Sequence, residues 1–100
     1  MSVLVIGKIP GDIAVFRQSL AERAGEFEKI AGGARAAGCV HHRFGLGDGF
    51  VTIVDEWESV AQFESFFADP ELLTFMASVG AAPAPPEITI VEAVVSPDQF

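Results

Sequence analysis

The chain has 100 residues, half of them apolar, and 14 acidic side chains against 6 basic ones give a formal net charge of −8. This length predicts a single domain over residues 1–100, large enough to bury roughly 60–70% of its extended-chain surface. The negative charge opposes a phosphate backbone or an anionic membrane surface, so we expect no nucleic-acid and no membrane partner.

The cysteine content and the chain's start favour a cytoplasmic protein. Cys39 is the only cysteine, so no internal disulfide can form, and a free thiol is typical of a reducing compartment. The apolar residues 3–6 lack a preceding basic region and are too few for a signal-peptide core. The longest uncharged run, residues 72–86, is interrupted by Gly80 and three prolines and cannot span a bilayer as a helix.

The first half of the chain predicts a strand followed by one long helix. Residues 2–9 form the strand, which Pro10 and Gly11 end, and Asp12 then suits a helix N-cap. Apolar residues follow at spacings of three and four, as expected for the buried stripe of an amphipathic helix: Ile13, Phe16, Leu20, Ala24, Phe27, Ile30 and Ala34. We expect this helix to end at Gly32 and Gly33 or at Gly38.

The second half predicts a hairpin, a helix and a last strand. Strands over residues 39–44 and 50–54 are joined by a glycine-rich loop at 45–49. Ser59 and Gln62 have the form of a capping box, and the helix that follows breaks or restarts at Asp69 and Pro70. Residues 83–86 form a stiff connector to a fourth strand at 87–95.

The predicted order β-α-β-β-α-β is that of an α+β, ferredoxin-like protomer with a four-stranded antiparallel sheet and two helices on one face. Strand alternation makes both sheet faces apolar, since Val3 and Val5 oppose Leu4 and Ile6. Two helices cover only one face, and monomers seldom expose so large an apolar patch. We therefore expect a homodimer that buries the open face.

Several short segments resemble a known family. They are the run Asp55-Glu56-Trp57-Glu58-Ser59 with Phe63 and the Asp-Pro break after it, and the turn Ala37-Gly38-Cys39-Val40. Together they resemble the antibiotic biosynthesis monooxygenase-like family of dimeric α+β barrels. The resemblance implies a barrel closed by two sheets and a pocket between sheet and helices. Some members oxidise aromatic polyketides with O2 and use no metal or flavin, whereas others degrade haem.

Two departures from the family narrow what the resemblance implies. The second helix carries no histidine, and the chain has no asparagine, which the haem degraders use on their first strand. We therefore expect neither haem chemistry nor a bound cofactor. The family's usual glutamate two residues before the tryptophan is the shorter Asp55 here.

His41 and His42 are the candidate catalytic residues. As neighbours on a strand they point to opposite faces, so they cannot bind one metal together, and no other ligand spacing exists. On a regular strand His42 shares its face with Val40 and Phe44, and His41 lies with Cys39 and Arg43, which makes His42 the better candidate base. The alternative is a packed histidine bonded to the backbone.

The candidate substrate-binding residues are Trp57, Asp55, Phe63, Phe67 and Met76. Trp57 either lines a pocket for a small apolar or aromatic ligand or anchors the core at the strand-to-helix junction. The helical aromatic residues leave the same choice between core and pocket wall. Two functions follow as hypotheses: a cofactor-independent monooxygenase acting on a polyketide- or quinol-like aromatic, or a non-catalytic dimer that binds a small ligand or has a structural role.

Overall fold

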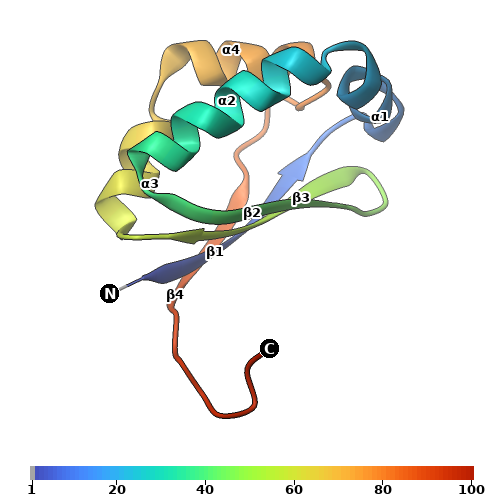
Figure 1. Cartoon of the computed structure of the whole chain (residues 1–100). Helices are drawn as coiled ribbons and strands as arrows, with labels where there is room; N and C mark the ends of the chain where they lie inside the picture. The colour runs from blue at the N-terminus through green and yellow to red at the C-terminus, as the bar shows by residue number, and fades with distance from the viewer. Residues whose placement is uncertain (1) are drawn as a thin grey trace.

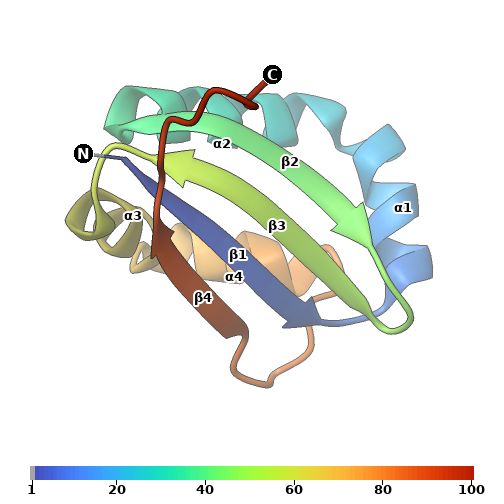
Figure 2. The same cartoon turned by 90° about the horizontal axis from the view of Figure 1, so that it is seen from below.

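A computed structural model describes residues 2–100 as one four-stranded antiparallel sheet with four helices on one of its faces (Figure 1). The strands are β1 (Val3–Pro10), β2 (Cys39–Leu46), β3 (Phe50–Trp57) and β4 (Glu87–Glu92), in the order β2-β3-β1-β4 (Figure 2). The helices are α1 (Ile13–Glu22), α2 (Ala24–Ala37), α3 (Val60–Phe67) and α4 (Pro70–Ser78). The predicted α+β, ferredoxin-like protomer is confirmed, although β3 is longer than predicted and β4 shorter.

The predicted helix starts are all present. The backbone N–H of Val15 donates to the Asp12 side chain over 3.1 Å, and that of Gln62 donates to Ser59 Oγ over 3.2 Å. Asp69 caps α4 in the same way, with Pro70 at the first helical position. Three helices, α1, α3 and α4, therefore begin directly after the residues predicted to cap them.

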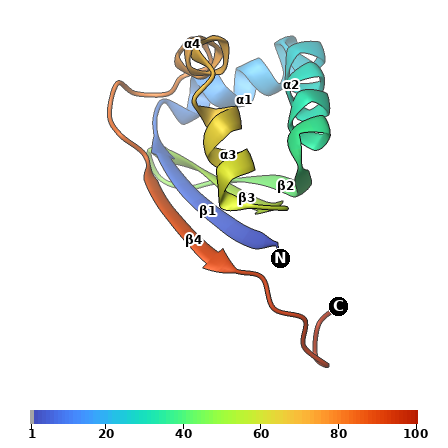
Figure 3. The ribbon, with the colours of Figure 1, turned by 90° about the vertical axis from the view of Figure 1, so that its left-hand side faces the viewer.

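The prediction of one long first helix is wrong, because the chain leaves helical geometry at Arg23 and restarts as α2 (Figure 3). One turn before this break, the buried Ser19 hydroxyl donates to the Val15 carbonyl over 2.8 Å, and such back-bonding bends helices. Gly32 and Gly33 do not end the helix either. It ends at Gly38, whose φ of 118° suits glycine.

The core lies between the sheet and the helices. Val5, Ile53 and Trp57 point from adjacent strands toward Phe63 of α3, and all four are at most 5% exposed. A second cluster joins Phe16 and Val51 to the end of α4. The four helices thus bury those side chains of the central strands β1 and β3 that point toward them.

Within residues 2–100, no helix or strand covers the other face of the sheet, here called the open face (Figures 1 and 2). Four apolar side chains on this open face are 36–50% exposed: Leu4, Ile6, Val54 and Val91. No helix among the described residues is long and apolar enough to cross a membrane.

Candidate functional site

A cavity of about 590 Å³ lies between the sheet and the helices. Its size falls within the range of small-molecule sites, roughly 300–1,000 Å³. Most of its wall is apolar. The aromatic rings that line it are those of Phe16, Phe27, Phe44, Trp57, Phe66, Phe67 and Phe75. Such a wall suits a flat, apolar molecule.

A chain of three side chains brings polar groups to this wall. Asp55 Oδ1 lies 2.7 Å from His42 Nδ1, and Trp57 Nε1 donates to the other carboxylate oxygen, Oδ2, over 3.1 Å. Asp55 is 3% exposed and Trp57 1%, whereas the His42 side chain is 36% exposed. The carboxylate is therefore fixed by the indole and in turn orients the imidazole. With Asp55 as the acceptor, Nδ1 carries a proton and Nε2 of the neutral ring is an acceptor.

A β-bulge at the start of β2 decides which residues face the cavity. Cys39 pairs with Trp57, but the next pair is His41 with Glu56, so Val40 is the extra residue. The bulge moves Cys39 onto the face that His42 occupies. The expectation that Cys39 shares a face with His41, and Val40 with His42, is therefore wrong.

The two histidines lie on opposite faces of the sheet, because the strand is regular from His41 onward. His42 pairs with Asp55, and its ring packs edge-on against Phe44 with centroids 4.5 Å apart. His41 pairs with Glu56, so strand alternation directs its side chain to the open face, although residue 41 also borders the cavity. The alternative that His42 bonds to the backbone is wrong for this structure, because its partner is a carboxylate.

The aromatic candidates divide between core and cavity wall. Phe63 is 5% exposed and packs edge-on against Trp57, so it belongs to the core, and it does not line the cavity. Phe67 and Met76 are half-buried and do line it. Trp57 is buried in the core and also borders the cavity, so the two positions predicted as alternatives are both occupied by this side chain.

Cys39 lies beside this site with a thiol that is hard to ionise. Burial, together with the nearby Asp55 carboxylate, raises the pKa of the Cys39 thiol to about 11. The thiol donates to the His41 carbonyl over 3.3 Å. A protonated, buried thiol is a poor nucleophile, so Cys39 acts here as a small apolar wall residue.

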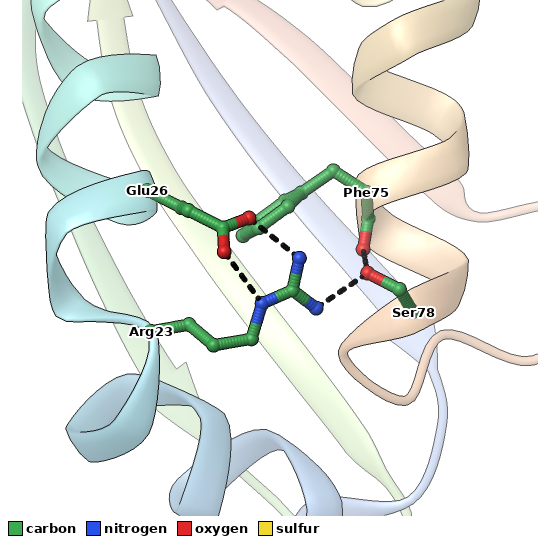
Figure 4. A network of polar contacts seen from close by, with 4 residues as sticks. All are labelled: Arg23, Glu26, Phe75 and Ser78. Atoms are coloured by element: carbon green, nitrogen blue, oxygen red, sulfur yellow. Dashed lines mark hydrogen bonds and ion pairs between the residues drawn. The ribbon is translucent and has the colours of Figure 1, made fainter.

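A clasp of four residues joins the α1–α2 junction to α4 above the sheet (Figure 4). The Arg23 guanidinium binds both carboxylate oxygens of Glu26, and its third nitrogen donates to Ser78 Oγ over 2.7 Å. Ser78 Oγ in turn donates to the Phe75 carbonyl, and the guanidinium lies 4.7 Å from the Phe75 ring centroid. Phe75 lines the cavity and packs against Phe27, so the clasp fixes one part of the cavity roof.

The described residues contain no cluster of three or more His, Cys, Asp or Glu side chains able to hold a metal ion. His42, Asp55 and Trp57 are bonded to one another at the cavity, and the other charged or titratable residues that border it are Asp12, Glu28, Arg35, His41 and Arg43.

Sequence reasoning missed the pairing of His42 with Asp55, although the sequence contains a signal for it. In an antiparallel hairpin, residues equally far from the turn face each other. Counting outward from the glycine loop pairs Leu46 with Val51 and Phe44 with Ile53, and then His42 with Asp55. Asp55 lies in the segment that resembles the family, and His42 lies on the adjacent strand.

A comparison with protein-family models finds no match for this chain, and neither does a comparison with curated protein sequences. Solved structures do match over nearly the whole chain. One is a monooxygenase from the gene ActVA-Orf6 of Streptomyces coelicolor, in complex with nanaomycin D. It has a TM-score of 0.66 and 19% identity over 97% of this chain and 93% of that one.

Two further structural neighbours differ in what is known of them. SnoaB, a cofactor-independent oxygenase from Streptomyces nogalater, has a TM-score of 0.57 and 14% identity over 98% of each chain. A protein of unknown function from Nitrosomonas europaea has a TM-score of 0.64 and 14% identity over 99% of this chain and 95% of that one. At these identities the neighbours establish a shared fold, that of antibiotic biosynthesis monooxygenase-like proteins.

Proposed function

We propose that the cavity binds a flat aromatic molecule and that His42 acts as the general base of a cofactor-independent oxygenation. The carboxylate-oriented imidazole on a mostly apolar cavity wall is the observation that carries this proposal. Two structural neighbours are named as a monooxygenase and a cofactor-independent oxygenase, which supports the same class of reaction.

The proposed reaction starts with proton transfer. His42 Nε2 removes a proton from a phenolic O–H or an activated C–H of a reduced polycyclic phenol, and the imidazolium is stabilised by Asp55. The substrate anion gives one electron to O2, and the two radicals combine to form a C–O bond. The imidazolium returns its proton to the peroxide. The oxygenated carbon then loses its remaining hydrogen as a proton while the O–O bond breaks, so the outer oxygen leaves as water and a carbonyl remains on the ring.

Each residue of the polar chain has a separate task in this scheme. His42 moves the proton, Asp55 holds its ring and tautomer, and Trp57 fixes the carboxylate and offers apolar surface to the substrate. The surrounding phenylalanines would shield the part of the substrate that they cover from water, which would slow simple reprotonation of the anion.

Oxygen uptake tests the proposal directly. With an anthrone-type substrate, we expect the wild type to consume O2 and His42→Ala to do so at least about tenfold more slowly, the usual contribution of a general base being larger still. His41→Gln is the matched control, because His41 is adjacent in sequence and pairs with Glu56 on the open face. Equal uptake by wild type and His42→Ala would remove His42 as the base.

The second candidate function is non-catalytic binding of a small aromatic ligand or a structural role. The observation favouring it is that Asp55 and Trp57 are already hydrogen-bonded to each other. Of the three linked side chains, only His42 has a nitrogen left to contact a ligand. This candidate predicts quenching of Trp57 fluorescence by an aromatic ligand without any oxygen consumption.

We also propose that two copies associate through their open sheet faces. Leu4, Ile6, Val54 and Val91 form a stripe of exposed apolar side chains across β1, β3 and β4, and burying such surface favours association. Light scattering at micromolar concentration should give twice the 10.6 kDa mass of the chain. A stable monomer under these conditions contradicts the proposal.

A further inference from the structure

The exposed residues that border the cavity gather on the side of α2 and β2. The residues that α3 and α4 contribute to its wall are all buried or half-buried. Apart from Asp12 and Leu20, the exposed ones are Glu28, Arg35, Val40, His41, His42 and Arg43. β2 is an edge strand, and α2 lies on the same side of the molecule, away from β4 (Figures 2 and 3). The cavity therefore opens to solvent between α2 and β2.

Arg35 stands on the flank of α2 that faces this opening. A Cβ added to Gly33 would lie 3.8 Å from the Phe66 ring, so the flank with Gly33 faces α3. Two residues further along, a rotation of about 200° in a regular helix reaches the opposite flank. Ala34, between the two, is buried in the core. Arg35 is thus at the rim of the cavity, above β2.

Basic side chains are concentrated at this opening, although the chain as a whole is acidic. Four of the eight Lys, Arg and His residues border the cavity, all of them between residues 35 and 43, against three of the 14 acidic residues. One of these acids, Asp55, is bonded to His42, and another, Asp12, caps α1. The end of the cavity near Arg35 therefore has positive charge to offer a ligand.

Glu28, the third acid, lies too far along α2 to neutralise Arg35. The seven residues between them correspond to about 10 Å at about 1.5 Å per residue. That distance reaches the screening length of about 8–10 Å at physiological salt. Among residues 2–100, no carboxylate forms an ion pair with Arg35. Its guanidinium donors are therefore available to an anion.

The other basic residues at the opening are less well placed for a ligand inside the cavity. Strand alternation directs His41 and Arg43 to the open face, because they pair with Glu56 and Val54. Arg35 belongs to the helix layer, on the same side of the sheet as the cavity. It is therefore the side chain that can meet a ligand's charge at the opening.

We propose that the aromatic molecule bound in the cavity carries a carboxylate group, which pairs with the Arg35 guanidinium at the opening. This inference rests on the aromatic ligand proposed above and narrows it to planar aromatic acids. The rings lie among the phenylalanines, while the acid stays at the solvent-exposed rim, so no charge is buried. A guanidinium holds a carboxylate through two parallel hydrogen bonds, which fixes the direction in which the ligand enters.

Two ligands that differ in charge but share their rings test the proposal. Anthraquinone-2-carboxylate is ionised at pH 7, whereas anthraquinone-2-carboxamide is neutral. In isothermal titration calorimetry we expect the wild type to bind the acid at least about fivefold more tightly than the amide, although its net charge of −8 repels anions. Added salt should weaken binding of the acid and leave that of the amide unchanged.

Arg35→Gln should abolish the preference, leaving the two dissociation constants within about twofold of each other. Arg17→Gln is the matched control, because it removes the same charge from an exposed position on α1 that does not border the cavity, and it should keep the preference. Arg35 is exposed, so its replacement should fold normally, which circular dichroism checks. A basic residue in the last helical turn also complements the helix dipole, but that role would change thermal stability and not the ratio of the two affinities.

The outcomes separate the acid group from the aromatic ligand. Equal binding of acid and amide by the wild type, or a preference that persists in Arg35→Gln, overturns the role of Arg35 and leaves the aromatic cavity standing. A preference lost equally in Arg17→Gln also overturns it, since the general charge of the protein would then be the cause. Binding of neither ligand overturns both proposals. Loss of the preference in Arg35→Gln alone supports the pairing.

Discussion

Replacing Asp55 by asparagine should reverse the tautomer of His42. Trp57 Nε1 can only donate, and at 1% exposure it has no water to turn to, so the asparagine must direct its carbonyl oxygen to Trp57. Its NH2 group then faces His42 Nδ1, which becomes the acceptor, and the proton moves to Nε2. The ring keeps its place but loses the lone pair that the proposed base needs.

The same change should cost measurable stability. Two hydrogen bonds to a charged acceptor, each about 1.5–3 kcal/mol, become neutral bonds of about 0.5–1.5 kcal/mol, so the free energy of unfolding should fall by about 2 kcal/mol. For a domain of this size that lowers Tm by about 8–16 °C. Asp48→Asn in the exposed β2–β3 turn removes the same charge and should change the free energy by less than about 0.5 kcal/mol.

Long-range ¹H–¹⁵N NMR of the imidazole ring, at a pH where it is neutral, reads the tautomer directly. In the wild type, His42 should carry its proton on Nδ1 and show an unprotonated Nε2, and Asp55→Asn should show the reverse. The reasoning is refuted if the wild type carries the proton on Nε2, or if the two proteins have the same tautomer.

Three other changes test separate parts of the structure. The pKa of the Cys39 thiol is higher in the folded protein than in the unfolded chain, so ionisation favours unfolding as the pH rises from about 9 to about 11. The free energy of unfolding should therefore fall over that range, and it should fall less steeply in Cys39→Ala than in the wild type. Arg23→Met keeps the contact with Phe75 but removes the clasp bonds, and stopped-flow fluorescence should show an aromatic ligand leaving several-fold faster; an unchanged rate shows that the clasp does not restrain the roof. Gly38→Ala should destabilise the protein by about 1–3 kcal/mol, since Gly38 has a φ of 118° and an added Cβ would lie 2.7 Å from the Gln62 side chain. Gly32 lies inside α2 with open space around it, so Gly32→Ala should stabilise the protein by about 0.5–1 kcal/mol. Thermal unfolding measures both changes.

The sequence predicted the fold because each element carries its own local signal. Alternation along β1 and β3, the caps at Asp12, Ser59 and Asp69, and the stripe of phenylalanines on α3 all agree with one topology. The break at Arg23 escaped prediction because the apolar spacing continues across it, and Arg23 finds its partners in Glu26 and in Ser78, far away in sequence.

The site was less predictable, because one inserted residue changes which side chains meet. The bulge at Val40 leaves no clear mark in the sequence, yet it brings Cys39 to the face of His42. The pairing of His42 with Asp55 was available from hairpin register. How large a space the surrounding phenylalanines leave open depends on the height of the helices above the sheet, which periodicity does not contain.

The central claim, that His42 is a base acting on a ligand in the cavity, is tested most directly by proton exchange without oxygen. In anaerobic D2O, the wild type should accelerate exchange of the activated C–H proton of an anthrone-type substrate, and His41→Gln should do so equally. His42→Ala should fall to the rate measured without protein. Exchange that is unaffected by the protein, or that persists in His42→Ala, contradicts the account.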